Sequence, residues 1–348
     1  PVQRSSFGKR KNTHRRYEIS ITKKLITLTS MKILANDGIS QAGENALKEA
    51  GLQLLEHKVA QEQLAPFINE YQVDVLLVRS ATQVRKELID ACPSLKIIGR
   101  GGIGMDNIDV EYARAKGILV INTPTASSRS VAEMVFAHFF SLARFLHESN
   151  RTMPLEGELK FSELKKSYSK AVELQGKNLG IIGFGSIGKE VAKMGIALGM
   201  NIEIFTRTPR TETLTLNFMD GQAVHFEIST TQDLQEFLSN KDFISLHTPK
   251  SEGYIIDHNQ FEQMKDGVFI ANTARGGVIN EVALLDAIES GKVAGAALDV
   301  FENEPHPELA LLMHPQLSLS PHLGGNTMDA QEKIGTELAA QIIQFFKN

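Results

Sequence analysis

Short apolar runs alternate with longer amphipathic stretches from residue 32 onward. Five runs have the length and composition of buried strands, and they are Lys32–Ala35, Leu52–Leu55, Val73–Val78, Leu95–Ile98 and Ile118–Ile121. Before the last of these, Asp109–Lys116 has helical spacing and is followed by Gly117, a residue type that often ends a helix. Alternation of strands and helices is typical of a parallel sheet covered by helices on both faces.

A second alternating series begins at Asn178. Its predicted strands are Asn178–Ile182, Asn201–Phe205, Asp242–Leu246, Val268–Ala271, Ala294–Leu298 and Leu317–Ser320. A long helix, apolar along one side, is predicted over Ser128–His147, and the polar segment from Glu148 to Gln175 has no strand pattern. An amphipathic helix is predicted over Met328–Phe346.

The two series indicate two doubly wound α/β domains with parallel sheets. We expect a flavodoxin-like substrate domain and a Rossmann dinucleotide-binding domain, with a cleft between them. The predicted boundaries give a basic, disordered extension over 1–30 and the first part of the substrate-binding domain over 31–125. The dinucleotide-binding domain is expected over 126–320, and residues 321–348 are expected to return to the substrate-binding domain as a C-terminal helix.

The composition is that of a soluble globular protein, with 348 residues of which 42% are hydrophobic and 22% charged. The longest apolar runs, such as Val75–Val78 and Leu179–Ile182, have strand length and are too short to cross a bilayer. The single cysteine, Cys92, excludes an internal disulfide and suits a reducing compartment. We therefore expect a cytoplasmic protein without a membrane partner, and no metal site is predicted.

Positive charge gathers in residues 1–30, which hold eight Lys and Arg against the single acid Glu18. The net charge of the whole chain is −4, so the rest of the chain is acidic and offers no footprint for nucleic acid. Two explanations of the basic segment stay open. It is either an upstream extension in a fragmentary reading frame or an organelle-targeting peptide.

Glycines at the start of the second series form the pattern Gly183-x-Gly185-x-x-Gly188. The pattern follows the predicted strand that ends at Ile182 and opens the helical stretch Lys189–Leu198, which is the context that a dinucleotide-binding turn needs. The three glycines permit a tight turn, close approach of a pyrophosphate and packing of helix on strand. The helix N-terminus supplies N–H groups for the phosphates. The alternative is a plain strand-to-helix turn.

The predicted strand Asn201–Phe205 lacks the acid that usually follows, about 20 residues beyond the glycines, to bind the ribose 2′-hydroxyl. Thr206 and Arg207 stand at that place, and Glu203 lies too early, inside the strand. Without a carboxylate nothing repels a 2′-phosphate, and Arg207 or Arg210 is able to pair with one. A preference for NADP and a tolerance of either cofactor are equally compatible with this pattern.

Three side chains suited to hydride and proton transfer follow predicted strands. Oxidation of a 2-hydroxy acid needs a base for the hydroxyl proton while a hydride leaves for the nicotinamide, and His322 suits that role because histidine titrates near neutral pH. Glu302 or Glu304 is able to orient the imidazole, and spacing does not choose between them. Arg275 offers a planar guanidinium that grips a carboxylate. Their shared place at strand ends favours a dehydrogenase.

Eight short motifs, ordered and well spaced, resemble the D-isomer-specific 2-hydroxyacid dehydrogenase family over about residues 32–348. They are Val78-Arg-Ser-Ala-Thr82, Gly99-Arg-Gly-Gly-Ile-Gly104 with Asp106-Asn107, Asn122-Thr-Pro124, the Gly183–Gly188 loop, His247-Thr-Pro249, Asn272-Thr-Ala-Arg-Gly-Gly277, Ala297-Leu-Asp-Val-Phe301 and Pro321-His-Leu-Gly-Gly325. The resemblance places the catalytic acid on Glu304, the arginine on Arg275 and the histidine on His322.

The resemblance also implies contacts with the dinucleotide and the substrate. Besides the three glycines, the implied cofactor residues are Ile103, Ser186, Ile187, Thr206, Arg207, His247, Thr248, Pro249, Thr273, Ala274, Asp299, Gly324 and Gly325. The implied substrate residues are Arg79, Ser80, Gly101, Gly102, Ile103 and Arg275. Thr206 departs from the acid of the NAD-using members, so NAD is the expected cofactor with NADP as an alternative. Arg79 suits a phosphorylated substrate, although a surface salt bridge would also explain it.

The resemblance implies oxidation of 3-phosphoglycerate to 3-phosphohydroxypyruvate, the first step of serine biosynthesis. The alternative is a glyoxylate or hydroxypyruvate reductase, which Thr206-Arg207 favours and Arg79 with Ser80 disfavours. A corepressor-like, dinucleotide-sensing scaffold is a further alternative. Because the chain ends soon after Phe346, a regulatory extension and feedback by serine are not expected. We expect a homodimer through the dinucleotide-binding domain, where the helix predicted over Ser128–His147 is either the dimer surface or a buried intradomain helix.

Overall fold

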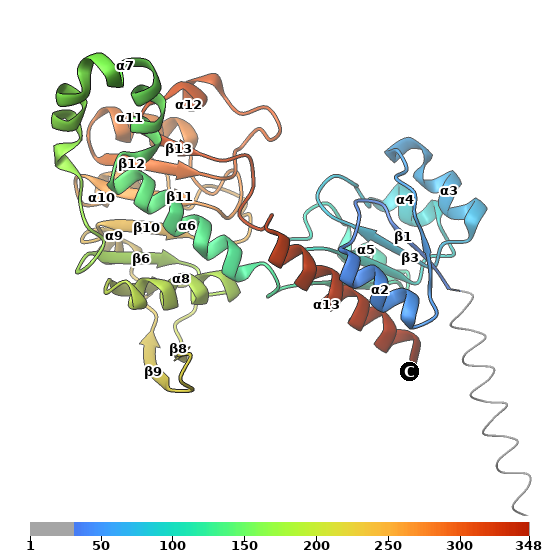
Figure 1. The fold of residues 1–348 in the computed structure, drawn as a ribbon. Helices are drawn as coiled ribbons and strands as arrows, with labels where there is room; N and C mark the ends of the chain where they lie inside the picture. The colour runs from blue at the N-terminus through green and yellow to red at the C-terminus, as the bar shows by residue number, and fades with distance from the viewer. Residues whose placement is uncertain (1–30, 348) are drawn as a thin grey trace, which may run out of the picture. The chain divides into compact units, whose positions relative to one another are not determined.

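The computed structural model describes residues 31–347, so the predictions for residues 1–30 lie outside the described residues. The described residues divide into two compact units, residues 31–127 with 328–347 and residues 128–327 (Figure 1). The sequence pattern places these boundaries after residues 125 and 320. The second boundary comes later in the structure because the backbone N–H groups of Leu323 and Gly324 both donate to Asp299 of the second unit.

The first unit contains a five-stranded parallel sheet. Its strand order is β2 (Gln53–Leu55), β1 (Lys32–Ala35), β3 (Val75–Val78), β4 (Ile97–Arg100) and β5 (Leu119–Asn122). One face packs against α3 (Leu64–Tyr71), α4 (Lys86–Ala91) and α5 (Val110–Ala115). The other face packs against α2 (Gln41–Glu49) and α13 (Met328–Lys347). This is the doubly wound order of flavodoxin-like folds, so the fold predicted for this part is confirmed.

The second unit contains a six-stranded parallel sheet. Its order is β13 (Leu317–Leu319), β12 (Val293–Leu298), β11 (Val268–Asn272), β10 (Phe243–Leu246), β6 (Asn178–Ile182) and β7 (Asn201–Phe205). One face packs against α6 (Ser128–Ala143) and α8 (Ser186–Ala197). The other packs against α9 (Leu234–Leu238), α10 (His258–Gln263), α11 (Glu281–Glu289) and α12 (Leu309–Met313). The order reverses between β6 and β10, which is where doubly wound sheets bind ligands.

The predicted strands are all present, with ends that shift by one or two residues. The helix predicted over Ser128–His147 is wrong at its C-terminal end. α6 stops at Ala143, Phe145 takes a left-handed conformation with φ 56°, and α7 (Leu146–Ser167) then runs through the segment that has no strand pattern. The apolar side of α6 is buried within the second unit, so α6 is an intradomain helix.

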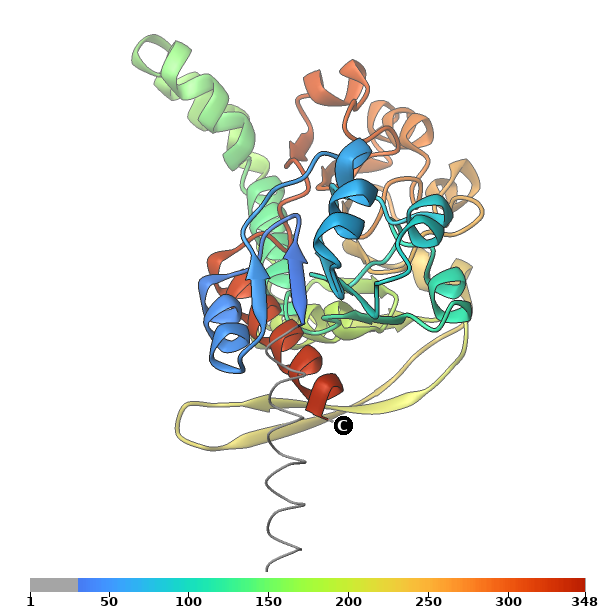
Figure 2. The same cartoon turned by 90° about the vertical axis from the view of Figure 1, so that its right-hand side faces the viewer.

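A β-hairpin that the pattern did not predict follows β7. Its strands, β8 (Thr211–Asn217) and β9 (Ala223–Ser229), are antiparallel and form a sheet of their own. Figures 1 and 2 show this hairpin as a yellow two-stranded ribbon that extends away from the six-stranded sheet. Among residues 31–347, no helix is both long enough and apolar enough to cross a membrane.

Candidate active site

The glycine-rich turn joins β6 to α8, and its glycines are required by close contacts. Gly183 has a φ of +101°, and a Cβ there would collide with the carbonyl oxygen of His247. A Cβ at Gly188 would collide with the carbonyl oxygen of Gly183, whereas one at Gly185 would meet no heavy atom within 4 Å. Gly185 is also the N-cap of α8, so open space lies above free backbone N–H groups. A pyrophosphate fits such a turn.

Three buried polar atoms gather at the carboxyl ends of the neighbouring strands β10 and β11. Nδ1 of His247 and the hydroxyls of Thr248 and Thr273 have no hydrogen-bond partner among the residues that the structure describes. Burial lowers the pKa of His247 to about 3, so this imidazole is neutral at ordinary pH. Because buried polar groups without partners are costly, their position beside the glycine turn suits a bound dinucleotide.

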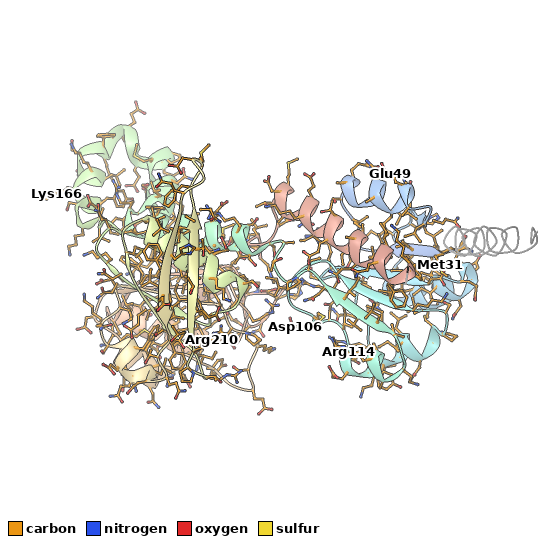
Figure 3. All side chains as sticks on the ribbon, turned by 90° about the horizontal axis from the view of Figure 1, so that it is seen from below. Met31, Glu49, Asp106, Arg114, Lys166 and Arg210 are labelled. Carbon is orange, nitrogen blue, oxygen red and sulfur yellow. The ribbon has the colours of Figure 1, made fainter. Side chains whose placement is uncertain are left out.

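Thr206 and Arg210 form the corner where the ribose 2′-position is expected. The Thr206 hydroxyl donates to the carbonyl of Thr208 at 2.9 Å and forms a second hydrogen bond, 2.7 Å long, with the Thr230 hydroxyl. Arg210, labelled in Figure 3, donates to the carbonyl of Phe184 and pairs through Nε with Glu212 at 2.9 Å. Arg207 is exposed. The corner therefore carries cations, and its carboxylate, Glu212, is already neutralised by Arg210.

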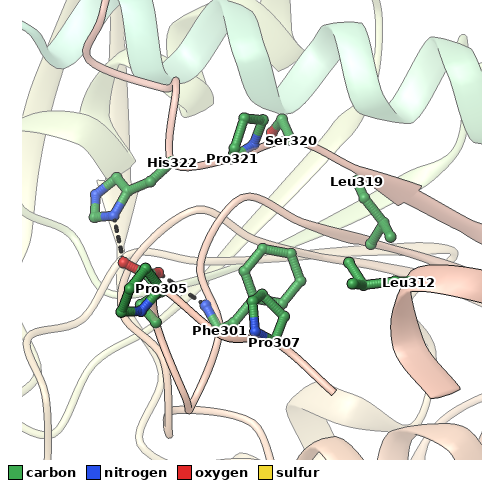
Figure 4. A pocket seen from close by; sticks show the side chains of 9 residues that line it. Phe301, Pro305, Pro307, Leu312, Leu319, Ser320, Pro321 and His322 are labelled. Atoms are coloured by element: carbon green, nitrogen blue, oxygen red, sulfur yellow. Dashed lines mark hydrogen bonds and ion pairs between the residues drawn. The ribbon is translucent and has the colours of Figure 1, made fainter. Parts of the chain in front are cut away.

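His322 and Glu304 form a hydrogen-bonded pair, with 2.9 Å between Nδ1 and Oε2 (Figure 4). The other carboxylate oxygen of Glu304 accepts from the backbone N–H of Phe301 at 2.9 Å. The hydrogen bond to Glu304 raises the pKa of His322 against the opposing effect of burial. Partial burial favours the neutral form of Glu304, but the hydrogen bonds from His322 and Phe301 outweigh it and lower the pKa of Glu304. The pair is thus set to hold a proton on His322.

Asp299 fixes the loop that carries His322. Its carboxylate is 1% exposed and accepts from the backbone N–H groups of Leu323 at 2.7 Å and Gly324 at 2.8 Å, and from the hydroxyl of Ser320 at 2.5 Å. The backbone N–H of His322 donates to the Asp299 carbonyl at 2.8 Å. His322 itself has a left-handed φ of 55°, which this set of bonds maintains. Contact of Asp299 with the cofactor stays a prediction.

Arg275 follows β11, at the same edge of the sheet as His322 and Glu304. Asn272 shapes this turn, because its side chain donates to the Arg275 carbonyl at 2.9 Å and accepts from the Ala274 N–H at 3.0 Å. One guanidinium nitrogen of Arg275 donates to the carbonyl of Ala274 at 2.6 Å. The structure therefore brings the three predicted catalytic residues to one edge of the sheet in the second unit.

A reciprocal pair of acids beside this edge was not expected from the sequence. The backbone N–H of Glu281 donates to the Glu302 carboxylate at 3.1 Å, and the N–H of Glu302 donates to the Glu281 carboxylate at 2.8 Å. Tyr254 adds a hydrogen bond to Glu302 at 3.2 Å. These bonds tie the segment after β11 to the segment after β12. By its position in the sequence, Glu302 was also a possible partner of His322. In the structure it bonds to Glu281 instead and connects these two segments.

The pocket of about 450 Å³ in Figure 4 lies directly beside the His322–Glu304 pair. Its other walls are mostly apolar and include Phe301, Leu312 and Leu319. The pocket gives the pair an apolar wall on one side, while the side chains of His322 and Glu304 stay 48% and 37% exposed. Cys92 lies in the first unit and is buried, and burial raises the pKa of its thiol to about 11, so it does not provide a nucleophile.

The predicted substrate residues of the first unit share one edge of its sheet. Arg79 and Ser80 follow β3, and the stretch 101–103 follows β4. The Arg79 backbone is fixed on both sides, because its N–H donates to Asp37 at 2.6 Å and its carbonyl accepts from Asn107 at 2.8 Å. The backbone N–H of Gly101 donates to the carbonyl of Val78 at 2.9 Å. Their roles, and the predicted cofactor contact of Ile103, stay predictions.

Comparison with known proteins gives one consistent family. The model for the NAD-binding domain of D-isomer specific 2-hydroxyacid dehydrogenases matches residues 136–324. The hydroxypyruvate reductase of Thermotoga maritima is 40% identical and is matched over 97% of its length and 90% of this chain. The D-3-phosphoglycerate dehydrogenase of Bacillus subtilis is 36% identical over 91% of this chain, which spans only 57% of that longer protein.

A similar solved structure supports the same family. It is the NADPH-dependent glyoxylate/hydroxypyruvate reductase of Sinorhizobium meliloti in complex with NADP and malonate, with a TM-score of 0.72 and 25% identity. The match covers 91% of this chain and 94% of that one. The chain therefore belongs to the D-isomer specific 2-hydroxyacid dehydrogenase family and is an oxidoreductase that uses a nicotinamide cofactor.

Proposed function

We propose that the chain interconverts 3-phosphoglycerate and 3-phosphohydroxypyruvate, with His322, Glu304 and Arg275 as its catalytic residues. The observation that carries the chemistry is the 2.9 Å hydrogen bond between His322 Nδ1 and Glu304. Since Glu304 accepts at Nδ1, Nε2 is left to take the hydroxyl proton of the substrate. Glu304 stabilises the imidazolium that forms, and Arg275 binds the substrate carboxylate. A nicotinamide held at the glycine-rich turn would supply the hydride acceptor.

Arg79 supports a phosphorylated substrate. The backbone of Arg79 is held by hydrogen bonds with Asp37 and Asn107. Its side chain is therefore anchored at the carboxyl edge of the sheet in the first unit. A phosphate group needs a cation in addition to Arg275, and a guanidinium is well matched to it. We assign Arg79 to that role, with Ser80 and the backbone of residues 101–103 beside it.

A hydroxypyruvate or glyoxylate reductase is the second candidate. The chain spans nearly the whole hydroxypyruvate reductase of Thermotoga maritima but little more than half of the Bacillus phosphoglycerate dehydrogenase. Initial rates with 3-phosphoglycerate and D-glycerate, and in reverse with 3-phosphohydroxypyruvate, hydroxypyruvate and glyoxylate, separate the two. If the substrate is 3-phosphoglycerate, kcat/KM is expected to be higher for each phosphorylated compound than for its unphosphorylated counterpart. The opposite order would establish the second candidate.

The corner around Thr206 supports the use of NADP as well as NAD. Thr206 stands where an acid would repel a 2′-phosphate, Arg207 is exposed, and Glu212 is neutralised by Arg210. The same initial rates measured with NAD and with NADP test this. The expected result is activity with both dinucleotides.

The exposed face of α7 supports a homodimer through the second unit. Leu155 and Leu159 are 83% and 89% exposed, and Phe161 is 59% exposed. Such apolar side chains on one helix are typical of an interface between subunits. Sedimentation of a Leu155→Asp/Leu159→Asp variant tests this assignment, with dissociation as the expected result. A cytoplasmic location, supported by the single cysteine, is part of the same proposal.

A further inference from the structure

The hairpin formed by β8 and β9 has one anchored strand and one outer strand. Leu214 of β8 is 3% exposed and joins the core between α8 and the sheet, and Glu212 of β8 pairs with Arg210 and Lys189. In β9 Phe226 and Ile228 are partly exposed, the other five residues are exposed, and none is buried. β9 is therefore the strand of the hairpin that presents an edge to solvent.

The backbone pattern shows which groups of β9 face outward. At the two ends of the hairpin, the N–H of Phe218 donates to Gln222 and the N–H of Thr230 donates to Arg210. Even-numbered residues therefore bond across the hairpin, and odd-numbered residues direct their N–H and C=O groups away from it. In β9 the outward residues are Ala223, His225, Glu227 and Ser229. In the part of the chain that the structure describes, β9 pairs with no strand other than β8.

The edge of β9 lacks the features that usually prevent strand pairing. Its seven residues pair with β8 in unbroken register from Ala223 to Ser229, without a bulge. The strand contains neither lysine nor proline. Exposed edges of this length normally carry such a residue or a bulge, because an unprotected edge is a template for another strand.

We propose that β9 pairs antiparallel with β9 of a second copy of this chain, so that two hairpins form a four-stranded sheet about a two-fold axis. With full overlap, Phe226 faces its own copy at the axis, and outward residues meet outward residues, as the ladder requires. His225 of each copy then stands directly opposite Glu227 of the other. About eight backbone hydrogen bonds form in this register.

The positions of His225 and Glu227 favour this register over others. They also favour a second copy of the chain as the partner strand. A slip of two residues in either direction would lose the pairing of His225 with Glu227, and one of the two slips would set Glu227 directly against Glu227, which is unfavourable. The Thr215 hydroxyl lies 3.0 Å from Nδ1 of His225 and orients the imidazole, which leaves Nε2 for the opposing carboxylate. An unrelated peptide would need to reproduce this acid–imidazole order, whereas β9 is complementary to itself.

Sedimentation velocity of the full chain over a range of concentrations tests the proposal, which does not depend on the proposed enzymatic function. His225→Glu sets carboxylate against carboxylate, and Glu227→Lys sets an ammonium against an imidazole. Each single variant is expected to halve the mass of the wild-type assembly. The double variant His225→Glu/Glu227→Lys restores opposite charges and is expected to restore the mass. Glu173→Lys, an exposed acid outside the hairpin, is the matched control and is expected to leave the mass unchanged.

Glu227→Pro provides an independent variant, because it removes one outward N–H and none of the hydrogen bonds within the hairpin. It is expected to halve the mass while circular dichroism and kcat stay at wild-type values. None of these substitutions lies in α7. If the chain also dimerises through α7, that dimer is expected to remain in every variant and to set the lower mass. A wild-type chain that sediments as a monomer, or a mass that none of the hairpin variants changes, would overturn the proposal.

Discussion

Glu281 and Glu302 each accept a hydrogen bond from the backbone N–H of the other, at 2.8 and 3.1 Å. The two acids lie 21 residues apart in the chain and connect the turn after Arg275 to the turn before Glu304. A Cβ at Gly276 would collide with the carbonyl of Phe301, so the two segments also touch through their backbones. Arg275 and Glu304, the proposed catalytic arginine and acid, therefore lie on segments that are bonded to each other.

The pH dependence of stability tests this junction. Burial raises the pKa of Glu281 from 4.5 to about 7, so the folded state binds this proton more tightly than the unfolded state. The stabilisation is fully present below pH 4.5 and is lost as the pH rises to 7. Glu281→Gln keeps an acceptor oxygen and does not ionise. Urea unfolding at pH 5 and pH 8 measures the free energy of unfolding of both proteins. The difference, variant minus wild type, is expected to be on the order of 2 kcal/mol more positive at pH 8 than at pH 5. An equal difference at both pH values would contradict the assignment.

The His322–Glu304 pair predicts the pH profile of the oxidation reaction. The base must be neutral to accept the hydroxyl proton, and the hydrogen bond to Glu304 raises the pKa of His322 above its ordinary value of 6.5. Activity is expected to fall as the pH decreases through that raised pKa. Glu304→Gln removes the charge, so the inflection of kcat/KM is expected to move to lower pH and the rate to fall roughly 10- to 100-fold. An inflection that stays in place would exclude Glu304 as the group that raises the pKa.

Cofactor choice is expected to respond to one substitution. Thr206→Asp restores a carboxylate where the ribose 2′-hydroxyl is expected, and this carboxylate repels a 2′-phosphate. The KM for NADP is expected to rise about tenfold or more, and the KM for NAD is expected to change little. Thr206→Ser is the matched control, because it retains the hydroxyl that bonds to Thr230. Equal changes for both dinucleotides would place the ribose elsewhere.

Substrate choice is expected to respond to Arg79→Ala. Loss of the guanidinium is expected to raise the KM for 3-phosphoglycerate about tenfold or more while the KM for D-glycerate changes little. Arg85→Ala is a suitable control, since Arg85 lies in the same unit and pairs on the surface with Asp109. Similar effects of Arg79→Ala on both substrates would rule out a phosphate contact.

Local patterns were sufficient to predict the two sheets. Strands such as β3 are buried along their whole length, and continuous apolar runs identify strands of that kind. The hairpin was not predicted, because continuous apolar runs identify buried parallel strands and its strands are largely exposed. Its local signals are the spaced threonines and leucines of Thr211–Asn217 and the turn residues Asp220-Gly221. α7 was missed because only Gly157 within it is buried, so no apolar stripe marks it.

The location of the candidate site could be predicted from the positions of its residues in the chain. Arg275, Glu304 and His322 follow parallel strands, and strand ends meet at one edge of a sheet. The partners of each side chain depend on tertiary contacts that spacing does not give. Glu302 and Glu304 look alike in the sequence, yet one bonds to Glu281 and the other to His322. The anchoring role of Asp299 likewise depends on backbone groups that only the folded loop brings to it.

The turnover of a His322→Asn variant tests the central claim most directly. Asparagine keeps a polar side chain in the loop held by Asp299 but provides no base. The kcat for oxidation is expected to fall roughly 10²- to 10⁴-fold, while the Kd for the dinucleotide, measured by fluorescence titration, stays within about twofold of the wild type. A variant that binds the dinucleotide and turns over at the wild-type rate would contradict the assignment of His322 as the catalytic base.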